Sequence, residues 1–321
     1  MPLPFSLDDV RAARAVIGER VHRTPTFGSR TLSGLTGADV FLKAELFQRT
    51  GSFKPRGVFN KLASLSPEEK ARGVISISAG NHAQALAFAA AAEGIDALVV
   101  MWETASPLKI AAAQGYGAAV DTEAPGPGEA FDRLGALVEE TGRTLVHPFD
   151  DPLVQAGQGT VGLELVEDVP NVDLVLVPVG GGGLIAGVAT AVKALRPEAR
   201  VVAVEPEQSP ALHEALKAGR QTRVAPTSIA DGLGAPFAGE DALAVAKELV
   251  DESVLVSEEE IETAFRFLYA RTKLACEPAG AATTAALLSK RVAAAPGETV
   301  VAVVSGGNVA PETAAAILAR S

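Results

Sequence analysis

Short apolar runs rich in β-branched residues alternate along the chain with longer segments rich in Ala and Leu. The apolar runs predict strands at 40–43, 74–78, 98–101, 144–146, 174–179, 200–205 and 299–304. The longer segments predict helices at 82–93, 107–114, 153–166, 184–195, 258–273 and 278–289. Because such alternation is typical of parallel sheets covered by helices, the pattern predicts an α/β fold with open, parallel-rich sheets. The Pro- and Gly-rich stretch 124–130 predicts a surface loop.

The composition argues against a nucleic-acid-binding protein and against a membrane protein. With 321 residues, 48% of them hydrophobic, the chain is long enough for about two domains. A formal net charge of -11 without a cluster of Lys or Arg argues against a nucleic-acid partner. The chain has no signal-peptide pattern and no apolar run of about 18 residues, and its one cysteine, Cys276, has no partner for an internal disulfide. We therefore expect a cytoplasmic protein that does not bind membranes.

The glycine-rich run VPVGGGGLIAG at 177–187 is the first candidate site. Four glycines, Gly180, Gly181, Gly182 and Gly183, follow an apolar strand and precede a helix, so their bare backbone N–H groups can converge on a phosphate. A tight turn without a ligand is the alternative. The same segment also fits the dinucleotide pattern G-x-G-x-x-A, with Glu205 at the end of the next strand as the ribose-binding acid.

Two more loops have the same form, and a lysine accompanies them. SISAGNHAQA at 76–85 and VVSGGN at 303–308 each end an apolar strand with Ser, Gly and Asn residues, although each also fits a plain turn. Lys54, in QRTGSFKPRG at 48–57, lies between an aromatic ring and small residues instead of on a solvated face. A lysine, a phosphate-binding loop and a carboxylate-binding loop at strand ends are what a pyridoxal phosphate enzyme needs, because its lysine holds the cofactor as a Schiff base.

Four motifs in this order, SFKPRG, SAGNHAQ, GGGGL and SGGN, resemble the fold-type-II pyridoxal phosphate family of threonine and serine dehydratases and serine racemase. The resemblance extends from about residue 21 to about residue 308. It implies two open sheets of the tryptophan synthase β type. It also implies a large domain formed by 1–63 and 148–321, with a smaller inserted domain at 64–147.

The resemblance also assigns roles to residues. Lys54 would be the catalytic Schiff-base lysine, with Phe53 near the pyridine face, Asn81 at the phenolic oxygen and Ser305 at the pyridine nitrogen. The phosphate would bind to Gly180, Gly181, Gly182, Gly183 and Leu184. The substrate carboxylate would bind to amides of Ser78, Ala79, Gly80, Asn81 and His82. A role near the ring is also implied, less directly, for Gly232 and Glu277.

The activity that the resemblance implies is a threonine/serine ammonia-lyase, which converts L-threonine to 2-oxobutanoate and L-serine to pyruvate with release of ammonia. Serine racemase and a hydroxyaspartate-type dehydratase are alternatives within the family. In serine racemases of this family a serine stands at the position of Ala79 and serves the second face of the α-carbon. A dinucleotide-dependent oxidoreductase and a non-catalytic nucleotide-binding module are alternatives from other classes.

The family also sets expectations for partners and metals. Dimers are common in it, so we expect a homo-oligomer, with a dimer favoured. Many relatives bind a divalent cation through an acidic residue that corresponds to Glu205, with a second carboxylate six residues later. Here Ala211 occupies that later position and Ser209 lies between them. Since hard cations prefer several oxygen ligands, we expect a weak or absent divalent requirement, with a monovalent ion as the alternative.

Overall fold

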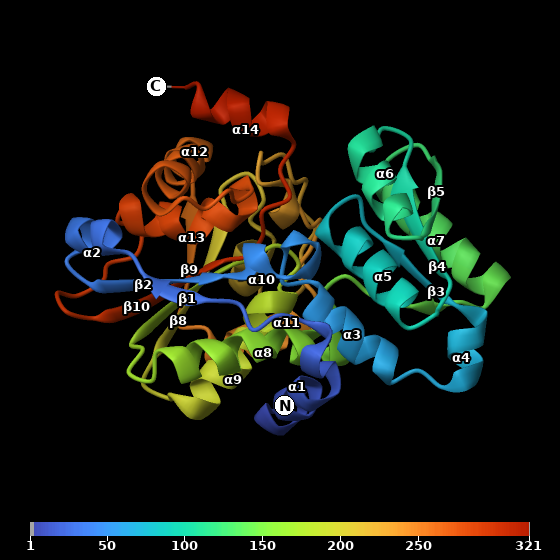
Figure 1. Cartoon of the computed structure of the whole chain (residues 1–321), viewed down its shortest axis with the longest axis horizontal. Coiled ribbons are helices and arrows are strands. Elements are labelled where there is room, and N and C mark those ends of the chain that lie inside the picture. The colour runs from blue at the N-terminus through green and yellow to red at the C-terminus, as the bar shows by residue number, and fades with distance from the viewer. Residues whose placement is uncertain (1–2, 321) are drawn as a thin grey trace.

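The computed structural model describes residues 3–320 and contains two β-sheets covered by helices (Figure 1). The larger sheet contains β1 (Thr26–Gly28), β2 (Asp39–Ala44), β7 (Leu174–Pro178), β8 (Arg200–Pro206), β9 (Glu252–Val256) and β10 (Thr299–Val304). Its strand order is β1-β2-β10-β7-β8-β9, and all neighbours run parallel except β1, which pairs antiparallel with β2 at one edge. Among residues 3–320, no helix is both long enough and apolar enough to cross a membrane.

Helices cover both faces of the larger sheet. They are α1 (Leu7–Ile17), α2 (Arg30–Thr36), α8 (Pro152–Asp168), α9 (Gly183–Leu195), α10 (Ala211–Ala218), α11 (Glu240–Leu249), α12 (Glu258–Phe267), α13 (Pro278–Leu288) and α14 (Pro311–Leu318). Successive side chains of a strand point to opposite faces of the sheet, so the central strands contribute to two hydrophobic cores, one on each face. Val175 and Val177 pack in the core with α8 and α9, whereas Leu174 and Leu176 pack in the core with α12 and α13. Burial on both faces explains why these strands are continuous apolar runs.

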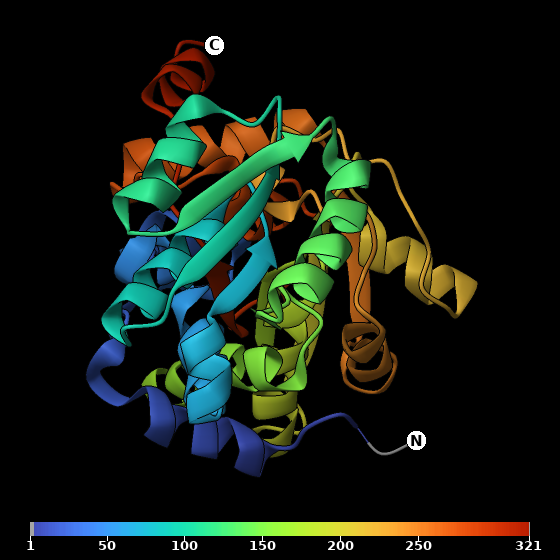
Figure 2. The same cartoon turned by 90° about the vertical axis from the view of Figure 1, so that its right-hand side faces the viewer.

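The smaller sheet forms a second lobe, which Figure 2 turns toward the viewer. Its strands are β3 (Val74–Ile77), β4 (Ala97–Trp102), β5 (Ala119–Ala124) and β6 (Thr144–Leu145), all parallel in the order β5-β4-β3-β6. Helices α5 (Asn81–Ala92) and α6 (Pro107–Gly115) pack on one face, α7 (Pro127–Thr141) packs on the other, and α4 (Pro67–Arg72) precedes β3.

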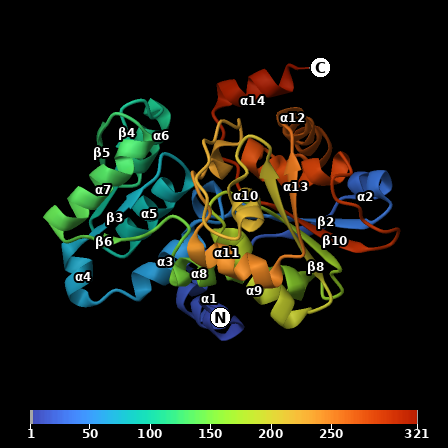
Figure 3. The same ribbon diagram turned by 180° about the vertical axis from the view of Figure 1, so that it is seen from behind.

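Two segments join the lobes. Helix α3 (Pro55–Ala63) lies between them, and it contacts α8 of the larger lobe and α5 of the smaller one (Figures 1 and 3). Residues 146–151 lead from β6 back to α8, and we call them the connector. Short 3-10 turns, η2 (Glu45–Phe47) and η4 (Asp231–Leu233), also lie in the larger lobe. The main chain therefore crosses between the lobes beside the carboxyl ends of the central strands.

The predicted fold class is confirmed, and each predicted strand and helix corresponds to an observed element. The prediction omitted β1, β5 and β9, since β1 and β5 are only partly buried edge strands and β9 alternates between buried and partly exposed positions. The loop predicted at 124–130 is confirmed only at residues 125 and 126, because β5 ends at Ala124 and α7 already begins at Pro127. Proline suits the first position of a helix, so this proline starts a helix instead of marking a loop. The domain boundaries stay a prediction.

Candidate active site

A pocket lies at the carboxyl ends of β7 and β10, where the two lobes meet. Ligands of open parallel sheets bind at this end of the strands. The lining residues come from both lobes: Phe53, Lys54, Asn81, Phe149, Pro178, Val179, Gly180, Gly181, Gly182, Gly183, Leu184, Gly232, Leu233, Glu277, Ala279 and Ser305. A larger open groove of about 530 Å³, between residues 3–7 and the ends of α9 and α11, contains none of the predicted site residues.

The four-glycine loop packs so closely against its surroundings that side chains would not fit. A Cβ at Gly181 would overlap the ring of Phe149, and a Cβ at Gly180 would lie 3.0 Å from the backbone of Leu233. Gly182 has a φ of 93°, which favours glycine, and it is the residue before α9. The first N–H groups of α9 lack acceptors within their own helix, so the loop has the properties of a phosphate cradle.

Lys54 directs its amine toward the connector. Its Nζ donates to the carbonyl oxygen of Pro148 at 2.7 Å and lies 5.2 Å from the ring centre of Phe53. Burial lowers the pKa of Lys54 to about 8, although the negative charge of Glu277 acts in the opposite direction. A larger fraction of the amine is therefore neutral near pH 7 than for a solvated lysine.

Glu277 and Asn81 form a polar group opposite Lys54. Asn81 Nδ2 donates to Glu277 Oε1 at 2.7 Å, while Asn81 Oδ1 accepts from Asn308 Nδ2 at 2.7 Å. The contact with Asn308 fixes the orientation of the Asn81 amide, so that its NH₂ group faces Glu277. Burial raises the pKa of Glu277 to about 8, against the hydrogen bond from Asn81. Glu277, for which the resemblance implied a role near the ring less directly than for the other residues, is thus a buried acid in the pocket.

The loop before α5 lies beside the pocket. Of its predicted site residues, Asn81 lines the pocket, whereas the side chains of Ser78, Ala79 and His82 contact residues outside it. Ser78 Oγ accepts the N–H of Gly80 at 3.1 Å, and Ala79 packs against the core of the smaller lobe. His82 is buried, and burial lowers its pKa to about 3, so the ring is neutral and Nε2 donates to the carbonyl of Val146 at 3.1 Å. His82 therefore supports the connector, whereas the backbone N–H groups at the start of α5 remain suited to a carboxylate.

Ser305 links the end of β10 to the segment that carries the lysine. The residue is buried and lines the pocket, and its carbonyl accepts the N–H of Phe53 at 3.2 Å. Its hydroxyl is uncharged, so it can accept a hydrogen bond or donate one without adding charge. Together with a phosphate cradle and a buried amine, this donor set fits pyridoxal phosphate.

Sequence reasoning missed Phe149 and the connector. The ring of Phe149 touches Gly181, and its carbonyl accepts from Gln155 Nε2 at 2.9 Å. His147 Nδ1 accepts the N–H groups of Phe149 and Asp150 at 3.3 and 2.8 Å, which fixes the turn. No motif marks this segment, because its contact with the glycine loop joins Phe149 to Gly181, which is distant in the chain.

Glu205 does not line the pocket. Its carboxylate accepts the N–H groups of Leu212 and His213 at 2.7 Å each, and burial raises its pKa to about 8. It therefore caps α10, which weakens the dinucleotide alternative. Residues 3–320 contain no group of three His, Cys, Asp or Glu side chains arranged to hold a metal ion. The expectation of a weak or absent divalent requirement near Glu205 stays a prediction.

The fold and the pocket define a pyridoxal-phosphate-dependent enzyme. A family model described as "Pyridoxal-phosphate dependent enzyme" matches residues 17–306, and the chain belongs to this family. The predicted family and its cofactor, pyridoxal phosphate, are confirmed.

Named relatives are similar over nearly the whole chain. The L-threonine ammonia-lyase of Thermotoga maritima is 45% identical over 95% of this chain and 76% of its own length. The catabolic L-threonine dehydratase TdcB of Staphylococcus aureus (strain N315) is 47% identical over 95% of this chain and 89% of its own. Among solved structures, the T.th. threonine deaminase is 44% identical with a TM-score of 0.89, covering 95% of this chain and 99% of that one. Maize serine racemase is 37% identical with a TM-score of 0.92, covering 96% and 95%.

Proposed function

We propose that this chain is a threonine/serine ammonia-lyase, which converts L-threonine to 2-oxobutanoate and L-serine to pyruvate and releases ammonia. The observation that carries the proposal is the meeting of Lys54, whose pKa is lowered, with the four-glycine loop in one pocket. The names of the two similar relatives, an L-threonine ammonia-lyase and an L-threonine dehydratase, support the same reaction.

Each part of the pocket has a role in this reaction. The N–H groups of Gly180 to Gly183 would bind the cofactor phosphate, and Ser305 and Asn81 would orient its ring. When bound, pyridoxal phosphate supplies an electron sink for the bond pair left on the substrate α-carbon. The N–H groups at the start of α5 would bind the substrate carboxylate.

Lys54 would do the proton chemistry. Its amine would hold the cofactor in the resting protein, and, once released, the neutral amine would take the α-proton of the substrate. That proton can leave with the β-hydroxyl as water. The carbonyl of Pro148, 2.7 Å from Lys54 Nζ, would hold the amine in place between these steps.

An absorption spectrum and a product assay test the proposal together. The purified protein should show a visible band of lysine-bound cofactor and should form 2-oxo acid and ammonia in equal amounts from L-threonine or L-serine. Lys54→Ala should lose both, whereas Lys217→Ala, at an exposed lysine of α10, should keep both. If the purified protein contains a bound dinucleotide and forms no 2-oxo acid, the proposal is wrong.

Serine racemase is a second candidate, because the structure of maize serine racemase is similar to this chain. The methyl group of Ala79 weighs against it, since racemisation needs a proton donor on the second face of the α-carbon. A hydroxyaspartate-type dehydratase remains an alternative within the family. A cytoplasmic location and a homodimer also stay predictions.

A further inference from the structure

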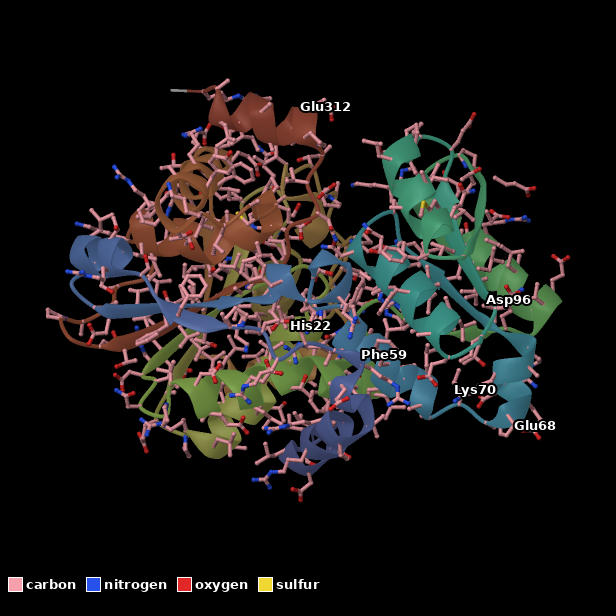
Figure 4. All side chains as sticks on the ribbon, in the orientation of Figure 1. His22, Phe59, Glu68, Lys70, Asp96 and Glu312 are labelled. Atoms are coloured by element: carbon pink, nitrogen blue, oxygen red, sulfur yellow. The ribbon has the colours of Figure 1, made fainter. Side chains whose placement is uncertain are left out.

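Arg56 lies two residues after Lys54 and is fully buried, with an exposed fraction of 0%. The guanidinium faces away from the pocket, toward η2 and α8. Burial by itself would lower the pKa of Arg56, but Glu45 and Glu164 raise it above its usual value, so it stays charged. Figure 4 labels His22 and Phe59, which mark this region at the junction of the lobes.

Arg56 donates hydrogen bonds to two carboxylates, those of Glu45 and Glu164. Its Nε and Nη2 donate to the two oxygens of Glu45, both at 2.8 Å. Its Nη1 and Nη2 donate to the two oxygens of Glu164 at 2.7 and 2.8 Å. Further bonds reach Thr160 Oγ1 at 3.1 Å and the carbonyl of His22 at 3.3 Å. Since bidentate pairs fix direction as well as distance, the side chain has little freedom.

Lys43 is the second cation of this cluster. Its Nζ donates to Glu164 Oε2 at 2.7 Å and to the carbonyl of Thr24 at 2.8 Å, and it is fully buried as well. Two cations and two carboxylates thus form a buried cluster of Lys43, Arg56, Glu45 and Glu164, and the carboxylate of Asp168 lies 3.8 Å from Lys43 Nζ at its edge. Buried ion pairs contribute little net stability compared with apolar packing of equal volume, because desolvation offsets their attraction. What such a cluster can supply is a fixed geometry.

The first turn of α3 also contacts α8 directly. Lys54 itself occupies the position before the helix and its side chain does not cap the first turn, where Gln158 Oε1 accepts the N–H of Gly57 at 3.3 Å. Gly57 packs directly on α8, where a Cβ would overlap the Gln158 side chain. Gly57 thus allows α3 to lie close to α8, and the bonds of Arg56 join the same turn of α3 to Glu45 in η2 and Glu164 in α8.

We propose that Arg56 is a positioning residue that, through Glu45 and Glu164, fixes the first turn of α3 and thereby aims the Lys54 amine into the pocket. This inference rests on the proposed role of Lys54. It goes beyond that role by assigning the direction of the amine to a cluster on the opposite side of the helix.

The test compares substitutions in one cluster. Arg56→Lys keeps the charge but loses the planar guanidinium that bonds both carboxylates, and Arg56→Met removes the charge at this position. Lys43→Met removes a cation from the same cluster but leaves every contact of Arg56 with Glu45 and Thr160 in place. The readouts are kcat and KM for L-threonine, the thermal midpoint, and the rate at which apoprotein captures pyridoxal phosphate, followed by borohydride trapping and intact mass.

We expect both Arg56 variants to lose at least tenfold in kcat and in capture rate, with KM within threefold of wild type. Lys43→Met should keep both rates within threefold although its thermal midpoint falls, which separates positioning from stability. Equal losses in Lys43→Met and Arg56→Lys, or wild-type rates in Arg56→Lys, would overturn the inference. Arg56→Lys decides the question even if Arg56→Met does not fold. If the wild type itself captures no cofactor, the proposed function fails and this inference with it.

Discussion

Burial and the nearby acid Glu277 have opposite effects on the pKa of Lys54. Burial lowers its pKa to about 8, and the charge of Glu277 acts against that shift. Only the neutral amine attacks an aldehyde, so protonation below the pKa slows the reaction. We therefore expect the rate of pyridoxal phosphate capture by the apoprotein to fall about tenfold for each pH unit below about 8, and to level off above it.

Stopped-flow absorbance of the apoprotein across pH measures this dependence. Lys54→Ala serves as the control, since it should show no covalent capture at any pH. A midpoint near 10.4, the approximate value of a solvated lysine, would mean that the amine is not buried as the structure places it.

Ala79 tests the choice between elimination and racemisation. The residue is half-buried beside the pocket and presents only a methyl group. If a serine hydroxyl supplies the second proton in the racemases, Ala79→Ser should gain formation of D-serine, whereas the wild type should form mainly pyruvate. Chiral chromatography of L-serine incubations measures both products. D-serine from the wild type at rates comparable to pyruvate would contradict the assignment as a lyase.

At the scale of elements, we expect the substitution of two glycines by alanine to change the stability of the protein in opposite directions. Gly181 lies in the turn from β7 to α9, where a Cβ would overlap Phe149. Gly181→Ala should destabilise the protein by about 1–3 kcal/mol and weaken cofactor binding at least tenfold, as overpacking does. Gly135 is exposed within α7, and among the described residues nothing lies within 4 Å of a Cβ there. Gly135→Ala should stabilise the protein by about 0.5–1 kcal/mol.

Urea denaturation of the two apoproteins and titration with pyridoxal phosphate give these quantities. Wild-type cofactor affinity in Gly181→Ala would show that the close approach of the loop to Phe149 is not required. A destabilised Gly135→Ala would show instead that an added methyl group is harmful even at a position with room for it.

At the scale of the molecule, contacts between the lobes lie beside the pocket. Lys109 of α6 pairs with Asp231, directly before the pocket residue Gly232. The ring of Phe131 in α7 lies 5.9 Å from that of Phe237, which in turn lies 5.6 Å from that of Phe149. Residues 231–237 of the larger lobe thus contact the smaller lobe through an ion pair of Asp231 and an aromatic contact of Phe237. The position of this segment ties the arrangement of the lobes to the residues around the cofactor site.

The sequence alone determined the features that depend on local pattern. Central parallel strands such as β7 and β10 are buried on both faces, so they appear as apolar runs that can be read directly. The four-glycine loop and the lysine in SFKPRG were visible for the same reason, since backbone conformation and residue chemistry act within a few positions. Edge strands such as β5 were missed because part of their surface faces water.

Only the tertiary structure decided which distant residues meet. Arg56 and Glu164 are 108 positions apart, and Asn81 and Glu277 are 196 apart, so no local period links them. Glu205 shows the same limit: its place at the end of a strand suggested a ribose ligand, but in the fold it caps α10. Such partners are set by the order in which strands return to a sheet and by the packing of helices between them, which a single sequence does not display.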